Sequence, residues 1–222
     1  NYAEYARQGF FQLMLVSIIN FVILVVSNNN RKEQTHKQKN YTKGMSIFIL
    51  IFTVIIILSA FYRMNLYEQE YGYTYLRLFV YYILATEMIL IIPCFIAIIG
   101  KKIDLLKVSI IILTTMYVFI NFSNIDSTIA TKNVDRYLKD ESQREIDISY
   151  LIRHTGTDAI PELTKLLKAK DEKVVERIKA YLYQEKQELE GEKMQWQEFN
   201  YSKQKAKNAL KELNKYNTNI YD

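Results

Sequence analysis

Glu87 is the residue whose position alone makes it a candidate for chemistry. It is the sole charged residue between Leu78 and Gly100, a stretch long and apolar enough to cross a membrane. A charge at that depth is costly and usually faces a partner or a water-filled cavity. Pro93 follows six residues later and removes a helical hydrogen bond, which predicts a kink. Two functional interpretations stay open: Glu87 lines a transport path, or it is a structural bond between helices. In either case we expect Glu87 to be protonated, bonded to a threonine or asparagine of a neighbouring helix, or paired with a span upstream of Asn1.

No other residue pattern has the spacing of an active site. The sequence lacks a glycine-rich phosphate loop, a nucleophile elbow and a histidine–cysteine set with metal-ligand spacing. His36 and His154 have no ligand-type neighbours at suitable spacing, and Glu68 and Glu70 are expected to be a solvated pair in a loop. The single cysteine, Cys94, excludes an intramolecular disulfide. We therefore expect no catalytic residue, no metal and no cofactor, and we interpret the protein as non-enzymatic.

Four apolar stretches can position Glu87 within a membrane, because a helix of roughly 20 apolar residues crosses a bilayer core. The predicted spans cover residues 9–26, 45–62, 78–100 and 103–122. The rest of the chain spaces its apolar residues as in short amphipathic helices that pack together. We predict an all-α protein with a multi-pass α-helical membrane domain over residues 1–122. A small soluble α-helical hairpin array follows over residues 123–222.

Capping residues divide this predicted tail into helices. Ser127, Asp147 and Asp158 each precede a segment with apolar periodicity and are predicted N-caps, and Asp171 is predicted to start a further helix. The last helix carries Trp196 and Phe199, which we expect to be buried anchors.

The distribution of charge predicts the topology. Residues 1–122 hold 11 lysine and arginine residues against six acidic ones, and residues 123–222 hold 18 of each kind. Basic residues concentrate in the loop 27–43 and at the Lys101–Lys102 turn, so the positive-inside rule places both in the cytoplasm. The tail then lies outside the cell membrane. Its balanced charge argues against a nucleic-acid partner.

Several stretches carry a resemblance to a known family: residues 2–11, 71–77, 124–126, 133–137, 147–151, 158–163 and 196–200. Together they resemble a bacterial membrane family known as domain of unknown function 4173. Its members have additional spans upstream, which implies that further spans precede Asn1. The family has no established activity, so the resemblance assigns no catalytic residue. Residues 124–126 read Asn-Ile-Asp where the resemblance implies Asn-Pro-Asp, which predicts a looser turn.

The predicted topology brings several of these stretches to the outer face of the membrane. The candidate functional residues are Glu87 and Pro93 within the third span and, on those stretches, Glu4, Arg7, Arg77, Asp126, Asn133 and Arg136. Either the outer residues gather into one polar and aromatic patch, or they anchor the spans and satisfy helix ends.

Two functional interpretations follow. The first is an integral membrane protein that presents an extracytoplasmic helical domain for protein interaction or sensing. The alternative is a transport or permease-type component that uses Glu87 and the kinked third span, although polar residues in the spans are sparse. The polar residues considered for such a path are Asn20, Thr86, Ser109, Thr114 and Thr115. A membrane-embedded enzyme is a third interpretation, weakened because the outer patch has acids but no histidine. The expected partners are the lipid bilayer and either a protein or the upstream spans.

Overall fold

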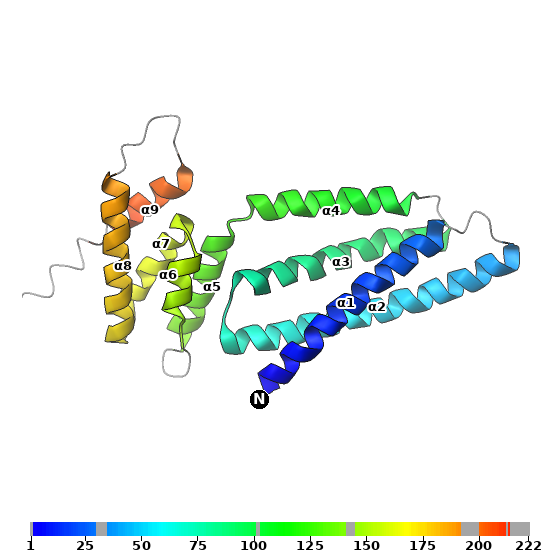
Figure 1. Cartoon of the computed structure of the whole chain (residues 1–222), viewed down its shortest axis with the longest axis horizontal. Helices are drawn as coiled ribbons and strands as arrows, with labels where there is room; N and C mark the ends of the chain where they lie inside the picture. The colour runs from blue at the N-terminus through cyan, green and yellow to red at the C-terminus, as the bar shows by residue number, and fades with distance from the viewer. Residues whose placement is uncertain are drawn as a thin grey trace, which may run out of the picture. The chain divides into compact units, whose positions relative to one another are not determined.

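The chain folds into α-helices throughout the part that the structure describes. That part, in a computed structural model, comprises residues 2–29, 35–100, 103–140, 145–191, 200–211 and 213. It contains α-helices and short 3-10 turns and no β-strand (Figure 1). The predicted all-α class is confirmed. The chain divides into two compact units, one of residues 1–71 and 76–123 and the other of residues 72–75 and 124–222.

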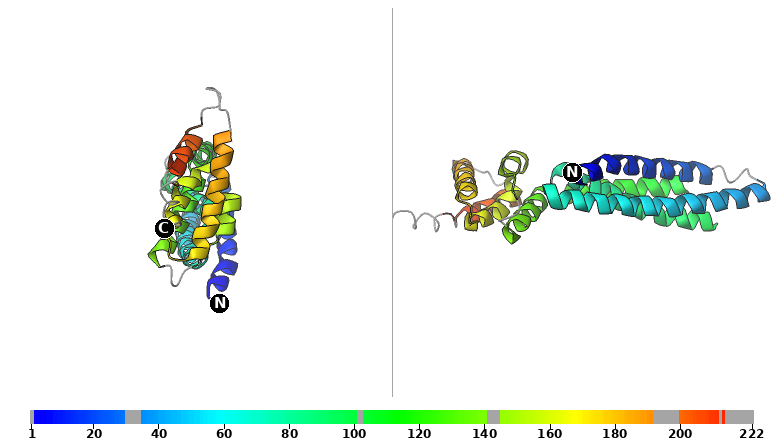
Figure 2. Two further views of the ribbon diagram at one scale, coloured as in Figure 1. Left: turned by 90° about the vertical axis from the view of Figure 1, so that its left-hand side faces the viewer. Right: turned by 90° about the horizontal axis from the view of Figure 1, so that it is seen from below.

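Four long helices form the first unit, here called the membrane unit. They are α1 (Tyr2–Asn29), α2 (His36–Tyr71), α3 (Tyr75–Ile99) and α4 (Leu105–Phe122). Each contains a stretch long and apolar enough to cross a membrane, which confirms the prediction of four helices able to do so and is consistent with a multi-pass membrane protein. Figures 1 and 2 show the four helices running alongside one another.

The helices extend beyond the predicted spans, most clearly in α2. This helix has 36 residues, from His36 to Tyr71, where the hydropathy predicts a span over 45–62 alone. The predicted loop 27–43 is therefore helical at both ends. Lysine, glutamine, glutamate and arginine favour helices, so the backbone does not have to leave the helix where the apolar stretch ends.

The four helices of the membrane unit differ in how much of their surface is buried. The apolar stretch of α3 is the most buried of the four, and that of α4 is the least. Ile57, Leu84 and Cys94 lie in the core between helices, whereas Phe48 and Ile111 point outward and are exposed. Outward apolar side chains on all four helices form a surface suited to lipid.

The ends of α3 and the position of Pro93 follow from local backbone chemistry. Gly72 (φ +76°) and Gly100 (φ +113°) adopt the left-handed conformation directly after Tyr71 and Ile99, where α2 and α3 end. Pro93 is buried within α3, and the helix continues past it to Ile99. Because proline has no N–H, the carbonyl of Ile89 lacks its helical donor there.

Short helices form the second unit, here called the helical unit. They are α5 (Ile125–Lys139), α6 (Ile148–His154), η2 (Thr157–Ala159), α7 (Ile160–Leu163), η3 (Thr164–Lys168), α8 (Glu172–Gly191) and α9 (Tyr201–Lys211). Helix α5 packs on η2 and α7, and α9 packs on α7 and α8. The predicted helical array is confirmed.

Of the three predicted N-caps Asp147 is correct, and a helix, α8, starts directly after Asp171. Asp147 accepts from the N–H of Tyr150 at 2.9 Å, and Asp171 Oδ1 accepts from the N–H of Lys173 at 2.9 Å. The prediction for Ser127 is wrong, because α5 already begins at Ile125 after the N-cap Asn124. That for Asp158 is also wrong, because this residue lies inside the turn η2 and leads directly into α7.

Apolar side chains from every helix of this unit fill one core. The fully buried ones include Ile129, Val134, Leu151, Ile160, Leu163, Leu166, Ile178, Leu182 and Leu210. Trp196 and Phe199, the expected anchors of the last helix, lie outside the described residues.

Candidate functional site

A loop clasp is the main feature of the helical unit. We use this name for the contacts that hold the loop Gly72–Tyr75 against Asn133, Arg136 and Tyr150. The N–H of Tyr73 donates to Asn133 Oδ1 at 2.9 Å, and Asn133 Nδ2 donates to the Tyr73 carbonyl at 2.9 Å. The side-chain amide thus pairs with the backbone in both directions, as a neighbouring β-strand would. It also donates to the Ile129 carbonyl at 3.0 Å and is buried, which fixes its orientation.

Gly72 fits the clasp because it has no side chain. Its φ is +76°, and a Cβ there would stand 2.5 Å from Asn133 Oδ1 and 3.1 Å from Arg136 Nη2. The backbone can therefore approach α5 closely only with glycine at this position.

Further contacts extend the clasp on both sides. The N–H of Tyr75 donates to the Tyr150 hydroxyl at 2.8 Å, and Lys132 Nζ lies 5.2 Å from the centre of the Tyr73 ring. Arg136 Nη2 donates to the Glu145 carbonyl at 2.8 Å. The clasp thus joins α5, α6 and a loop about 60 residues upstream into one body.

The candidate residues of the predicted outer patch separate into different environments. Asn133 and Arg136 meet Gly72 in the clasp, while Asp126 accepts from the N–H of Gly156 at 2.9 Å. Arg77 belongs to the membrane unit, where its guanidinium lies 4.5 Å from the centre of the Tyr67 ring and donates to the Tyr71 carbonyl at 2.9 Å.

Glu4 and Arg7 lie near the start of α1, and their side chains are outside the described part of the structure.

A polar layer crosses the membrane unit at the depth of Glu87. We define it as Ser17 and Asn20 of α1, Thr53 of α2 and Glu87 of α3. Ser17 Oγ lies 2.8 Å from Glu87 Oε2, and Asn20 Nδ2 donates to Thr53 Oγ1 at 3.0 Å. Ser17 and Asn20 stand three residues apart and so share one face of α1. Helix α1 is therefore linked by polar contacts to both α2 and α3 at this level.

Ser17 and Thr53 of this layer are not among the residues predicted from the sequence. The predicted side-chain partner of Glu87 is a threonine or asparagine, whereas the structure has a serine there. The signal that could have found Ser17 is its spacing of three residues from Asn20 in an otherwise apolar stretch.

Glu68 is buried, contrary to the expectation of a solvated pair with Glu70. It is 2% exposed and accepts from the Tyr81 hydroxyl at 2.7 Å. The reason is that α2 continues to Tyr71, so these carboxylates sit on a helix and not in a loop. Two residues apart, they point to different sides, and Glu70 alone is exposed.

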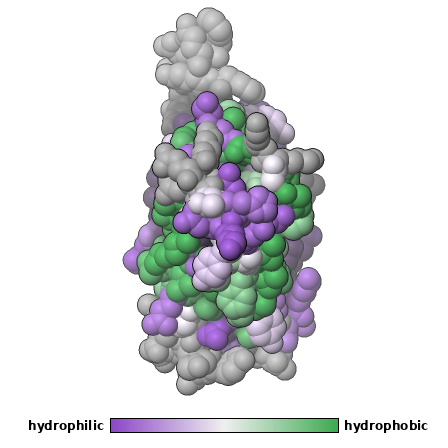
Figure 3. Space-filling model, turned by 90° about the vertical axis from the view of Figure 1, so that its right-hand side faces the viewer, coloured by the Kyte–Doolittle hydropathy of each residue, from purple (hydrophilic) through white to green (hydrophobic). Residues whose placement is uncertain are grey.

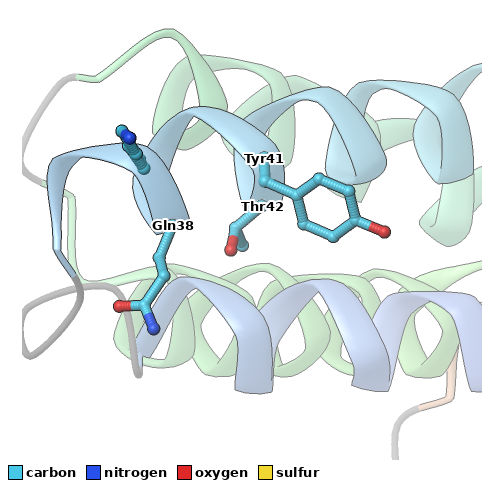
Figure 4. A pocket seen from close by; sticks show the side chains of 4 residues that line it. Gln38, Tyr41 and Thr42 are labelled. Atoms are coloured by element: carbon cyan, nitrogen blue, oxygen red, sulfur yellow. The ribbon is translucent and has the colours of Figure 1, made fainter.

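The described residues offer no other arrangement typical of catalysis or metal binding. They contain no group of three potential metal ligands, and the His154 ring stacks on Tyr150 with 4.7 Å between ring centres. A shallow hollow in the first turns of α2 is lined by Lys37, Gln38, Tyr41 and Thr42 (Figure 4). All four come from one helix, so they define no converging site. Figure 3 views the end of the membrane unit where α2 begins, and hydrophilic side chains gather there.

Residues 1–166 match the family model described as Domain of unknown function (DUF4153). The chain belongs to the DUF4153 family. The resemblance drawn from the sequence was correct at the level of a domain family of unknown function, while the family shown is DUF4153 and not the one numbered 4173. No curated protein and no solved structure matches the chain. The region matched to DUF4153 includes the whole clasp and the polar layer, whereas α8 and α9 lie beyond it.

Proposed function

We propose that this DUF4153 protein is a non-enzymatic protein of a bacterial cell membrane that presents its helical unit on the outer side for protein interaction or sensing. The observation that carries the proposal is the two-way pairing of Asn133 with Tyr73. It makes the linker between the spans α2 and α3 a structural part of the helical unit. The partner is a protein or further spans of the same assembly.

The clasp gives a partner of the helical unit a means to act on the spans. The chain passes between the two units on both sides of Gly72–Tyr75 and again after Ser123. A partner that shifts α5 therefore pulls on the residues where α2 ends and α3 begins. The partner can shift the equilibrium between the clasped and the open loop only by the difference in its binding free energy for the two states. Each hydrogen bond of the clasp contributes about 0.5–1.5 kcal/mol. A partner whose binding free energy differs by this amount between the two states is enough to offset one such bond.

The distribution of basic residues supports the outward orientation. Lys37, Lys39 and Lys43 lie at the start of α2 and Lys107 at the start of α4, which is one end of the membrane unit. The positive-inside rule places this end in the cytoplasm, and the linker Gly72–Tyr75 then lies outside.

A transport role is the second candidate function. It is favoured by Glu87, which is 4% exposed and bonded to a neighbouring span, because buried carboxyls in membranes often mark ion or proton paths.

A comparison of two substitutions in cells separates these functions. The assay is rescue of whichever growth or stress phenotype follows deletion of the gene. Asn133→Leu removes the clasp bonds at similar volume, and Glu87→Gln keeps the shape of the neutral acid. For an interaction or sensing role, Asn133→Leu abolishes rescue at normal protein level, whereas Glu87→Gln rescues fully. If Glu87→Gln abolishes rescue and Asn133→Leu rescues fully, the transport role is favoured over the interaction or sensing role.

A matched control is available at the N-cap of the same helix, α5. Asn124 is exposed and its side chain makes no capping bond. Asn124→Leu should rescue like the wild type, which separates loss of the clasp from a general effect of leucine.

A further inference from the structure

The contact between Glu87 and Ser17 is incomplete in a way that points to a ligand. Both residues are almost fully buried, with 4% and 0% exposed. Glu87 Oε2 is 2.8 Å from Ser17 Oγ, but Glu87 Oε1 is buried without a hydrogen-bond partner among the described residues. An ionised carboxylate would leave half of its charge without a donor here, which is costly in a membrane interior.

The serine hydroxyl has two candidate acceptors and only one proton. Ser17 Oγ lies 2.7 Å from the Met14 carbonyl as well as 2.8 Å from Glu87. If Ser17 donates to Met14, the contact with Glu87 is a hydrogen bond only when the carboxyl itself donates.

The neighbouring pair shows the same arrangement with its direction settled. Thr53 Oγ1 donates to the Ile49 carbonyl of its own helix at 2.7 Å and accepts from Asn20 Nδ2 at 3.0 Å. Ser17 is the equivalent hydroxyl in α1, with the Met14 carbonyl of its own helix at 2.7 Å, and Glu87 occupies the position that Asn20 has beside Thr53. The pattern favours a carboxyl that carries a proton.

No charged group on the helices packed around Glu87 lies at its depth. In sequence, α1 has no charged residue from Gly9 to Asn29, and α2 has none from Met45 to Tyr62. Beyond these limits α2 carries Lys37, Lys39 and Lys43 towards its start and Arg63, Glu68 and Glu70 towards its end. In α4, Lys107 lies near the start and no charged residue follows up to Phe122. Within α3 itself, Arg77 is the next charged residue, ten positions earlier. Among the described residues, none supplies a positive charge at this depth, so a neutral, protonated carboxyl is favoured.

We propose that Glu87 and Ser17 form a proton-binding site between α1 and α3. In the loaded state, the protonated Glu87 carboxyl donates a hydrogen bond to Ser17 Oγ, and the Ser17 hydroxyl donates a hydrogen bond to the Met14 carbonyl. On release, the O–H bond of the Glu87 carboxyl breaks and its proton passes to water. The carboxylate remains, and the Ser17 hydroxyl turns its hydrogen bond from Met14 to Glu87 Oε2. This inference is independent of the loop clasp and of the function proposed for it.

Infrared difference spectroscopy of the full chain in lipid bilayers tests the site. At neutral pH, the spectrum of the wild type minus that of Glu87→Gln should contain the carbonyl band of one neutral carboxylic acid. Raising the pH should remove that band in a one-proton titration while a carboxylate band grows. A carboxylate band at neutral pH would overturn the proposal. A neutral band that persists at every pH at which the protein stays folded would also overturn it.

Two further variants keep the test decisive. Ser17→Ala leaves Glu87 in place and should shift the neutral-acid band, because the acceptor of its proton is gone. If Glu87→Gln fails to fold, absence of such a shift in Ser17→Ala refutes the site. Asp104, whose side chain is 54% exposed, is the control carboxyl. Asp104→Asn should leave the neutral-acid band unchanged.

Discussion

Replacing Gly72 by alanine should open the loop clasp. An alanine at φ +76° costs about 1–2 kcal/mol in backbone strain. Its Cβ would also stand 2.5 Å from Asn133 Oδ1, so the Asn133 side chain must move away. That movement breaks both bonds to Tyr73, each contributing about 0.5–1.5 kcal/mol. We expect a total loss of about 2–5 kcal/mol for the closed loop.

Hydrogen exchange measures this loss at the residues concerned. The amides of Tyr73 and Tyr75 are both donors in the clasp. A loss of about 2 kcal/mol or more should speed their exchange roughly thirtyfold or more, since 1.4 kcal/mol corresponds to a factor of ten. Amides in the middle of α3 should exchange as in the wild type.

Gly44→Ala is the matched control for Gly72→Ala. Gly44 lies inside α2, and a Cβ there would meet no atom within 4 Å. Alanine should stabilise this helix by about 0.5–1 kcal/mol and leave the loop unaffected. If Gly72→Ala leaves the exchange of Tyr73 unchanged, the clasp does not hold the loop and the proposed role of Asn133 is wrong.

The remaining predictions concern topology, core and pH. Cysteines introduced by Thr35→Cys and by Gln187→Cys, both at exposed positions, should react oppositely with an impermeant maleimide in intact cells carrying Cys94→Ala; outside labelling at Thr35→Cys would reverse the topology. Ile178→Ala removes a fully buried side chain and should cost the helical unit about 2–5 kcal/mol, so an unchanged melting temperature would contradict its core. Burial raises the pKa of the Tyr181 hydroxyl, so the folded state holds that proton after the unfolded chain loses it at about pH 10. Stability should then fall as pH rises above about 10, and Tyr181→Phe should lessen the fall in thermal melts.

The spans were predictable from sequence because they depend on one strong local signal. The absence of charge from Gly9 to Asn29, for example, marks α1 without knowledge of its neighbours. The helix ends were not predictable from the sequence, because polar residues such as those around Glu68 are as compatible with a helix as with a loop. The prediction of Ser127 as an N-cap was wrong for a similar reason. Helix α5 begins about one turn earlier, after Asn124, and asparagine is as favourable as serine at an N-cap.

The contacts of the candidate sites were harder to predict than their residues. Asn133 and Tyr73 both stood in stretches singled out from the sequence, but they are 60 residues apart and no local pattern pairs them. Ser17 was overlooked because a serine among apolar residues has little signal of its own. Its role depends on the rotation of α1 against α3, which only the packed structure reveals.

The clasp also implies an order of events during synthesis and folding of the chain. The linker Gly72–Tyr75 is synthesised before α4, yet its partner Asn133 follows 60 residues after Tyr73. Until α5 has been synthesised, the N–H and C=O of Tyr73 lack the two bonds that Asn133 makes with them in the folded unit. Closing a loop of this length carries an entropic cost that local helix formation does not. Completion of the helical unit is therefore a late event in biogenesis, and it requires that both ends of the clasp reach the same side of the membrane.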